Sequence, residues 1–354
     1  MNLLRRIDAG VALAPLLIFS IGAVTLLSTS SDRVTNQLFF FSFGLALYIL
    51  AALIDYEFYK HYWFVAYGVV VALLALTYLA GHVVGGAARW LNLSLFTIQP
   101  SEFAKVAVVI FTASLISTLK RRSLNPTFLV RLTALFLPVL FLVVVQPDLG
   151  TAIILLLIFV GILFYAGVNK IYFVLAFVVL GLFSSPIWAN LHDYQKERII
   201  VFLNPTLDVA GSGYNVIQST IAIGSGGLLG RGFGHGTQTH LQFLPVYWTD
   251  FIFAAFAEEW GLVGVVCILV FYAALLVSVL RISFKVESSF GSLLCAGVFI
   301  LFFSQFGINV GMNLGILPVT GIPLPLVSYG GSSLVTSLFL LGLVQSVWIH
   351  RRGR

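Results

Sequence analysis

The chain has 354 residues, of which 60% are hydrophobic and only 9% are charged, whereas a soluble globular domain carries roughly 25% charged residues. With a mean hydropathy of +1.04, the chain lacks the polar surface that would cover a soluble core, so a water-soluble fold is excluded. The net charge of +6 therefore does not indicate nucleic-acid binding. In a membrane protein Lys and Arg set the orientation, and they are read loop by loop.

Apolar stretches of about 20 residues, each able to cross roughly 30 Å of hydrocarbon as a helix, recur along the chain. They predict an all-α polytopic membrane protein with ten transmembrane helices, at 9–28, 37–54, 62–80, 102–119, 132–146, 150–168, 171–189, 251–280, 290–310 and 331–349. We expect a single membrane domain over residues 1–354, without an internal repeat or a separate soluble domain.

An even number of spans places both termini on one side of the membrane. That side carries 13 of the 19 Lys and Arg residues: Arg5, Arg6, Lys60, Lys120, Arg121, Arg122, Arg131, Lys170, Arg281, Lys285, Arg351, Arg352 and Arg354. By the positive-inside rule this side is cytoplasmic. Both termini are therefore expected in the cytoplasm.

The opposite, outer side carries three segments rich in Pro and Gly, at 81–101, 190–249 and 311–330. Pro and Gly interrupt helices, and long irregular segments are uncommon unless they are functional. We therefore expect the functional site to face outward. The stretch 190–249 is predicted to form a long, partly helical outer loop between the seventh and eighth spans.

Several familiar sites are absent from the sequence. No G-x-x-x-x-G-K-[ST] loop occurs, so no nucleotide cofactor is expected, and no D-x-D pair is present to hold a metal diphosphate. His235 and His240 are five residues apart, a poor spacing for metal ligands. Cys267 and Cys295 lie inside apolar runs, which excludes a disulfide framework. A transferase with this sequence would use an activated donor that resides in the membrane.

Charged residues stand where two spans begin. Pro100 and Ser101 are helix-start signals, and the spacing places Glu102 and Lys105 on one helical face. They form either a local ion pair or a site in which Lys105 holds an anionic lipid head group near the helix N-terminus. Asp148 begins the sixth span, either as an N-cap or as part of the site.

Asp250 begins the helix after the longest loop, where the loop meets hydrocarbon. It is either a helix cap or a general base, because a partly dry site raises a carboxyl pKa toward values useful for proton abstraction. Glu258 and Glu259 lie deeper, and such intramembrane acids are either functional, or pair with a buried base or hydrogen-bond a broken helix. The Gly-rich run 224–236 is predicted to be a flexible loop at a helix end rather than a phosphate cradle.

Nearly the whole chain resembles the SEDS family of integral-membrane peptidoglycan glycosyltransferases. The motifs that carry the resemblance are individually weak, but their order and spacing are specific: Gly86-Ala-Ala-Arg-Trp-Leu91, Gln99-Pro-Ser-Glu102 with Lys105, Gln146-Pro-Asp-Leu-Gly-Thr-Ala152, Gly213-Tyr-Asn-Val-Ile-Gln-Ser219, Ile221-Ala-Ile-Gly-Ser-Gly-Gly-Leu228, Thr249-Asp-Phe-Ile-Phe253 with Glu258-Glu259, Pro318-Val-Thr-Gly-Ile-Pro-Leu-Pro325, and Ser328-Tyr-Gly-Gly-Ser-Ser333.

Two further segments, 236–238 and 243–245, resemble the elongation-type RodA branch of the family more than the division-type FtsW branch. One stretch departs from the family pattern. Where members usually carry a Glu and a His before the Thr-Asp pair, this chain has Val246-Tyr-Trp248. Roles that relatives give to those two residues do not transfer to this chain.

The resemblance implies polymerisation of lipid II on the outer leaflet of the bacterial cytoplasmic (inner) membrane, for cell elongation and shape. The 4-hydroxyl of an acceptor would attack the anomeric carbon of a donor strand on undecaprenyl diphosphate, with inversion and loss of the lipid diphosphate. Asp250 matches the family's essential Asp, the proposed general base. Lipid tails are expected in a groove between spans.

The resemblance also implies a set of substrate-binding residues: Arg89, Gln99, Glu102, Lys105, Asp148, Arg198 and Ser328. Among them Lys105, Arg89 and Arg198 are the cations expected to help the diphosphate depart. A divalent cation, Mg²⁺ or Mn²⁺, is expected to share that task, but no ligand set is apparent in the sequence.

A class B penicillin-binding protein, a transpeptidase, is the partner that the resemblance implies. The rival hypothesis is a flippase or transporter of lipid-linked precursors, since ten spans with interrupted helices also suit alternating access. A flippase would carry functional polar residues through to the inner face, whereas this sequence concentrates them outside. A third hypothesis, a non-catalytic scaffold, predicts that Asp250→Asn leaves activity unchanged.

Overall fold

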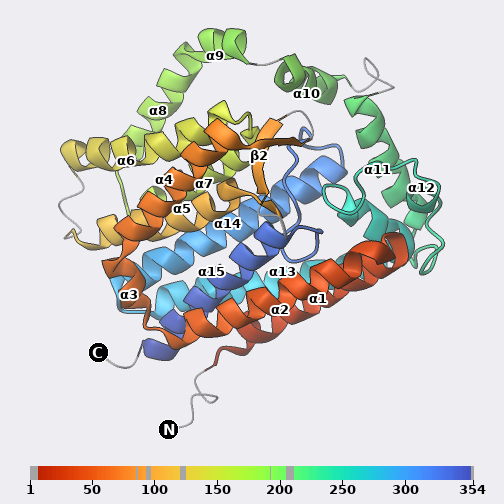
Figure 1. The fold of residues 1–354 in the computed structure, drawn as a ribbon, viewed down its shortest axis with the longest axis horizontal. Helices are drawn as coiled ribbons and strands as arrows, with labels where there is room; N and C mark the ends of the chain where they lie inside the picture. Colours follow the sequence, from red (N-terminus) through yellow and green to blue (C-terminus); the bar gives the residue numbers. More distant parts are fainter. Residues whose placement is uncertain are drawn as a thin grey trace.

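The computed structural model describes residues 7–84, 87–92, 97–119, 125–191, 193–204 and 211–351. These residues form a helical bundle in which both chain ends lie at the same end (Figure 1). The opposite end, which we call the distal end, carries the strands and the segment after residue 191. Some basic residues counted above lie outside the described residues: Arg5, Arg6, Lys120, Arg121, Arg122, Arg352 and Arg354.

The helices confirm the prediction of a polytopic membrane fold. Eight are long and apolar enough to span a membrane: α1 (Ala9–Thr29), α2 (Ser31–Leu53), α4 (Trp63–Ala80), α5 (Pro100–Ser117), α6 (Pro126–Val145), α13 (Ile252–Lys285), α14 (Ser289–Asn313) and α15 (Gly331–His350). Two shorter apolar helices fall at the sixth and seventh predicted spans: α7 (Leu149–Tyr165) and α8 (Lys170–Leu182). All ten predicted spans therefore coincide with apolar helices.

The seventh predicted span, 171–189, is not one continuous helix. The structure ends α8 at Leu182 and starts α9 (Ser184–Asn190) after a non-helical turn at Phe183. Pro186 supplies the physical reason, because its ring clashes with the carbonyl four residues earlier, that of Leu182. None of the α8 side chains is buried, and Figure 1 shows α8 and α9 standing away from the body of the bundle.

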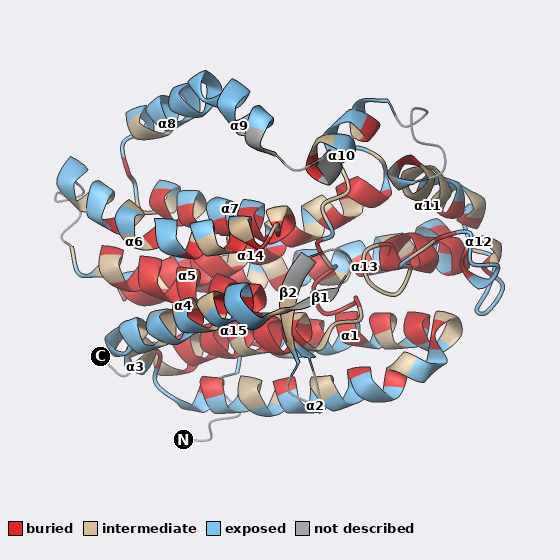
Figure 2. Ribbon diagram, turned by 45° about the horizontal axis from the view of Figure 1, so that its top comes forward, coloured by how far each residue is buried: buried red, intermediate tan, exposed pale blue. Residues whose placement is uncertain are grey.

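Two helices form the centre of the bundle. α5 and α15 are buried over most of their length, whereas α4, α6 and α8 present apolar side chains outward, as membrane-facing helices do (Figure 2). α15 packs closely against α2 because small residues let the backbones meet. A Cβ at Gly342 would lie 2.5 Å from the Tyr48 carbonyl oxygen.

The distal end contains elements that hydropathy did not predict. Segment 81–101 forms a small antiparallel sheet in the order β1-β2-β3, with strands β1 (His82–Val84), β2 (Ala87–Asn92) and β3 (Thr97–Ile98). The long loop after α9 is partly helical, as expected, with α10 (Asp193–Leu203), α11 (Ser212–Gly226) and α12 (Thr237–His240). A short helix, α3 (Tyr56–His61), lies at the opposite end.

Helix α13 is interrupted at Gly261, where φ is 61° and ψ is −162°. The Gly-rich run, expected to be a flexible loop, instead pairs with the backbone at this break. Its hydrogen bonds are Arg231 N to Glu258 O (3.0 Å), Gly232 N to Glu259 O (3.0 Å), Leu262 N to Gly227 O (2.9 Å) and Val263 N to Leu228 O (3.1 Å). The loop thus satisfies backbone groups that the interruption frees, as an apolar surrounding requires.

Candidate functional site

Asp250 lies at the distal end, immediately before α13. The N-cap of α13 is Phe251, and no side chain caps this helix. Asp250 therefore does not cap α13, which was the alternative to its role as a general base. Its carboxylate and the Arg198 guanidinium both lie beside Gly321, and the charge of Arg198 acts on the carboxylate. A Cβ added to that glycine would lie 3.7 Å from Asp250 Oδ2 and 3.9 Å from Arg198 Nη1. Helix α10 therefore brings a cation to the carboxylate.

The surroundings of Asp250 act on its pKa in opposite directions. Burial raises the pKa of this carboxyl above its ordinary value, because desolvation disfavours the charged form. The charge of Arg198 and a hydrogen bond from the Thr249 side chain both lower it, and the net shift is upward. A carboxylate with a raised pKa is a better proton acceptor, which is what a general base needs.

Two buried asparagines of α14 hold the backbone at Asp250. Asn309 Nδ2 and Asn313 Nδ2 donate to the Asp250 carbonyl at 3.1 and 3.0 Å. Asn309 Nδ2 also donates to the Ile322 carbonyl at 2.8 Å, next to Gly321. Sequence reasoning missed this clamp, although two amides four residues apart on an apolar helix are a signal of internal polar contacts.

Ser328 supports the same segment from the other side. Its hydroxyl donates to the Thr249 carbonyl at 2.6 Å and accepts from Leu324 N at 2.8 Å. Gln37 of α2 joins this arrangement by donating to the Ser328 carbonyl at 3.1 Å and accepting from Gly330 N at 3.3 Å. Ser328, expected to bind substrate, is buried here and fixes the residue before Asp250.

Three other predicted site residues meet in a second cluster at the start of α7. Asp148 caps this helix by accepting from Thr151 N at 3.2 Å, and it also accepts from Ser101 Oγ at 2.9 Å and Gln99 Nε2 at 3.2 Å. Arg89 Nη1 lies 3.9 Å from Asp148 Oδ1. The cluster joins β2, α5 and α7.

Glu102 and Lys105 form the local ion pair that was one of their two alternatives. Their Nζ and Oε2 atoms are 2.7 Å apart, and each side chain is 3% exposed. Thr336 of α15 donates to Glu102 Oε2 at 3.4 Å. In this conformation the ammonium of Lys105 is enclosed by protein and turned to its own helix rather than to the surface.

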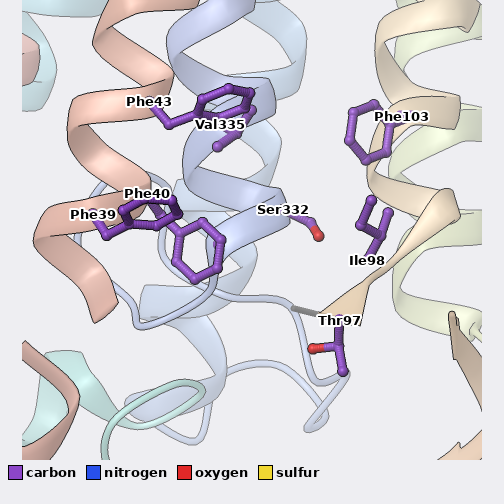
Figure 3. Close-up of a pocket in the computed structure, with 9 residues that line it drawn as sticks. Phe39, Phe40, Phe43, Thr97, Ile98, Phe103, Ser332 and Val335 are labelled. Atoms are coloured by element: carbon purple, nitrogen blue, oxygen red, sulfur yellow. The ribbon is translucent and has the colours of Figure 1, made fainter. Parts of the chain in front are cut away.

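A half-open apolar pocket of about 110 Å³ lies between α2 and α5, with α15 behind it. Figure 3 shows the aromatic side chains of α2 facing Phe103 of α5 across this space. The lining residues are Phe39, Phe40, Phe43, Thr97, Ile98, Phe103, Gly331, Ser332 and Val335. Ser332 Oγ also accepts from Gln99 N at 3.1 Å, so the pocket borders the Asp148 cluster.

Glu258 and Glu259 hold the outer loop to the interrupted helix. Glu258 accepts from Gln238 N at 2.8 Å and from the Thr239 hydroxyl at 2.9 Å. Glu259 Oε1 accepts from Gly234 N at 3.2 Å and contacts His240 Nε2 at 3.3 Å. The contacts of Glu258 and Glu259 therefore correspond to the structural alternative, in which these acids hold an interrupted helix.

Besides the Glu102–Lys105 ion pair, the predicted residues fall into two neighbourhoods, one with Asp250 and Arg198 and one with Asp148, Arg89 and Gln99. The segment from Ser328 to Ser332 connects them, because its first residue bonds to Thr249 and its last to Gln99. Within the residues that the structure describes, no three His, Cys, Asp or Glu side chains gather in a way that would hold a metal ion.

Comparison with known proteins gives consistent matches. The sequence profile of the FtsW/RodA/SpoVE family, described as cell cycle protein, matches residues 3–353. Peptidoglycan glycosyltransferase MrdB of Escherichia coli K12 is 41% identical over 314 residues, which cover 87% of this chain and 84% of that protein. Peptidoglycan glycosyltransferase RodA of Treponema pallidum is 32% identical over 417 residues, covering 98% and 96%.

Solved structures agree with these matches. A chain from a peptidoglycan synthase complex, reported for its coordination of polymerization and crosslinking, has a TM-score of 0.85 at 33% identity, covering 98% of this chain and 99% of that one. The crystal structure of the rod shape determining protein RodA of Thermus thermophilus has a TM-score of 0.75 at 28% identity, covering 98% of each chain.

Proposed function

Because the chain belongs to the FtsW/RodA/SpoVE family of cell cycle proteins, we propose that it is a peptidoglycan glycosyltransferase that polymerises lipid II for cell elongation and shape. The similarity to relatives named MrdB and RodA supports this assignment. Within the molecule, the observation that carries it is the proximity of Asp250 and Arg198 at the distal end, because this places one base near one cation just before a membrane helix.

In the proposed reaction, Asp250 takes the proton of the acceptor 4-hydroxyl while that oxygen forms a bond to the anomeric carbon of the donor. The bond from this carbon to the diphosphate oxygen breaks, and the lipid diphosphate leaves with the electron pair. One displacement inverts the configuration. The raised pKa of Asp250 favours the proton transfer, and Arg198 offsets negative charge beside it.

The apolar pocket between α2 and α5 is suited to a hydrocarbon tail. Its lining is almost wholly apolar, and at Ser332 it borders the cluster of Gln99, Asp148 and Arg89. A tail seated there would place its head group near these polar residues. We further propose that the distal end faces outward from the cytoplasmic membrane and that both termini are cytoplasmic, as the distribution of Lys and Arg favours.

A divalent cation, Mg²⁺ or Mn²⁺, would take most of its ligands from the substrate diphosphate and from water, because Mg²⁺ sites of this kind use only one or two protein carboxylates. No cluster of three metal-binding side chains occurs among the described residues, so they assign no ligand set to the ion. When bound, the ion would supply charge neutralisation for the leaving group.

The proposed partner is a class B penicillin-binding protein, a transpeptidase. Support comes from the similarity to a chain of a peptidoglycan synthase complex that coordinates polymerization and crosslinking. The exposed helix α8 and the partly exposed helices α10 and α11 offer surface for such an assembly.

The decisive experiment is polymerisation of lipid II by the purified protein, with and without a cognate transpeptidase. Wild type is compared with Asp250→Asn at equal folded amounts, and with Glu287→Gln, an exposed carboxylate away from the distal end, as control. We expect polymer from wild type and the control, and none from Asp250→Asn, because the amide has no basic oxygen to accept the proton.

Absence of polymer from wild type, even with the transpeptidase present, would contradict the proposal and favour the flippase hypothesis, which a lipid-scrambling assay then tests. Equal activity of Asp250→Asn and wild type in the assembly would instead favour a scaffold.

A further inference from the structure

Two aromatic rings stand next to the segment that carries Asp250. Tyr329 N donates to the Trp248 carbonyl at 2.9 Å, and the neighbouring residues repeat the link through Ser328 and Thr249. The backbones of Trp248 and Tyr329 are therefore hydrogen-bonded to each other, and Trp248 is two residues from Asp250 along the chain.

Arg33, in the first turn of α2, is stacked on these rings. Its Cζ atom lies 3.8 Å from the centre of the Trp248 ring and 5.5 Å from that of Tyr329. A guanidinium over the face of Trp is held by cation–π attraction. The guanidinium carries five N–H donors in its own plane.

Few acceptors from the described residues compete for these N–H donors. Arg33 donates no side-chain hydrogen bond to a described residue, and its nearest carboxylate, Asp32, lies 3.9 Å away and is 78% exposed. Such exposed pairs are weak. Two of the cations predicted to bind substrate already have protein partners. Lys105 is enclosed with Glu102, and Arg89 donates to the carbonyls of Gln146 and Pro147.

Arg33 also has a defined relation to the apolar pocket. Arg33, Gln37 and Phe40 follow one another at helical spacing on one face of α2, and Phe40 lines the pocket (Figure 3). Seven residues of helix correspond to a rise of about 10 Å. The backbone of Arg33 thus lies about 10 Å from that of Phe40 along the axis of α2, toward the distal end.

We propose that Arg33 is a diphosphate-binding residue for a polyprenyl-linked substrate whose hydrocarbon chain enters the pocket between α2 and α5. The planar fork of Arg matches phosphate oxygens, and its support on two rings reduces the entropy lost on binding. This inference rests on the proposed function for the identity of the lipid. Trp248 stands in the stretch Val246-Tyr-Trp248, where this chain departs from the pattern that family members usually carry.

Binding tests the inference without requiring catalysis. The purified full-length protein in nanodiscs of zwitterionic lipid is titrated with undecaprenyl diphosphate, undecaprenol and inorganic diphosphate. The variants are Arg33→Gln and Arg33→Lys, with Arg231→Gln, an exposed arginine of the outer loop, as control. Arg33→Lys keeps the charge, so it supplies a folded comparison should Arg33→Gln lose stability.

We expect Arg33→Gln to weaken undecaprenyl diphosphate binding by about ten- to a hundredfold, the usual contribution of charged hydrogen bonds, with undecaprenol binding unchanged. The affinity of Arg33→Lys for undecaprenyl diphosphate should lie between those of wild type and Arg33→Gln, because Lys keeps a point charge but loses the planar fork of donors. Arg231→Gln should bind as wild type does. Inorganic diphosphate should bind far more weakly than the lipid, since it cannot use the pocket.

Unchanged undecaprenyl diphosphate binding by Arg33→Gln would overturn the inference. Equal losses for undecaprenyl diphosphate and undecaprenol would overturn it as well, because a general structural defect affects both. Failure of the proposed function has a different signature: wild type would form no polymer from lipid II, whereas the difference between the two lipids in the Arg33 variants would persist.

Discussion

At Asp250, burial and charge act against each other. Enclosure by protein raises the pKa of this carboxyl, and the Arg198 guanidinium and the Thr249 hydroxyl lower it. Without the opposing charge, more of the carboxyl would be protonated and unable to accept a proton at a given pH. Arg198 therefore keeps the base ionised over a wider pH range while burial keeps it basic.

This balance predicts the pH dependence of the reaction. The rate should be constant above the pKa of Asp250 and fall about tenfold per pH unit below it, with the fall centred above the ordinary range of Asp, about 3.9. Replacing Arg198 by Gln removes a charge that lowers the pKa, so the acid limb of kcat/KM should move to higher pH. The measurement is lipid II polymerisation as a function of pH.

Lys196→Gln is the matched control for that prediction. Lys196 lies on the same helix, and its ammonium donates to the Ala189 carbonyl at 3.3 Å rather than acting on Asp250. An acid limb that moves equally in both variants, or that moves downward in Arg198→Gln, would contradict the assigned role of Arg198.

The sequence could predict individual site residues better than their contacts. Asp250 was identifiable because it stands where a loop meets an apolar run. Its pairing with Arg198, 52 positions earlier in the sequence, depends on how α10 returns over the bundle, which no local pattern encodes. The Asn309 and Asn313 clamp was missed for the same reason, since its acceptors come from the segment just before α13 and from the loop before α15.

At the scale of elements, the apolar spans were predictable because each needs about 20 apolar residues, a property of the local sequence. The break after α8 and the sheet β1-β2-β3 were not predicted. The sheet depends on pairing between short strands rather than on hydropathy. The interruption of α13 depends on a loop that arrives from 30 residues upstream.

That loop gives a stability prediction at Gly230. This residue has φ of 82°, and a Cβ there would lie 2.1 Å from the Glu259 carbonyl oxygen. We expect Gly230→Ala to lower the unfolding temperature in detergent, at a cost of about 1–3 kcal/mol for the strained backbone and the clash. Gly224→Ala is the control, because α11 is helical there and open space surrounds the position. Equal unfolding temperatures for the two variants would contradict the role of the loop.

At the scale of the whole molecule, the bundle has two chemically different ends. The chain termini share one end with short connections, and the distal end carries the sheet, α10 to α12 and the polar clusters (Figure 1). Composition and the placement of Lys and Arg were sufficient to predict this asymmetry. They could not predict that α5 and α15 form the buried centre, because apolar residues face both lipid and protein in a membrane bundle.

The proposed orientation is tested by labelling. In a background with Cys267→Ala and Cys295→Ala, single cysteines are introduced by Asp32→Cys at the distal end and by Lys285→Cys at the end of α13. A membrane-impermeant maleimide applied to intact cells should label the first and not the second, since only the distal end is proposed to face outward. After cell lysis both should react. The reverse pattern in intact cells would show that the distal end is cytoplasmic.

The buried pair of Glu102 and Lys105 has a consequence for biosynthesis. A single Lys or Asp costs about 2.5–3.5 kcal/mol during insertion by the translocon when it lies at the centre of a helix, and less near a helix end, where Glu102 and Lys105 lie. Here both charges lie three residues apart on α5, so the helix carries its own counter-ion as it leaves the ribosome. Helix α15, which later covers this position, is synthesised more than 200 residues afterwards. Segment α5 can therefore enter the bilayer as a nearly neutral unit long before its final neighbour exists.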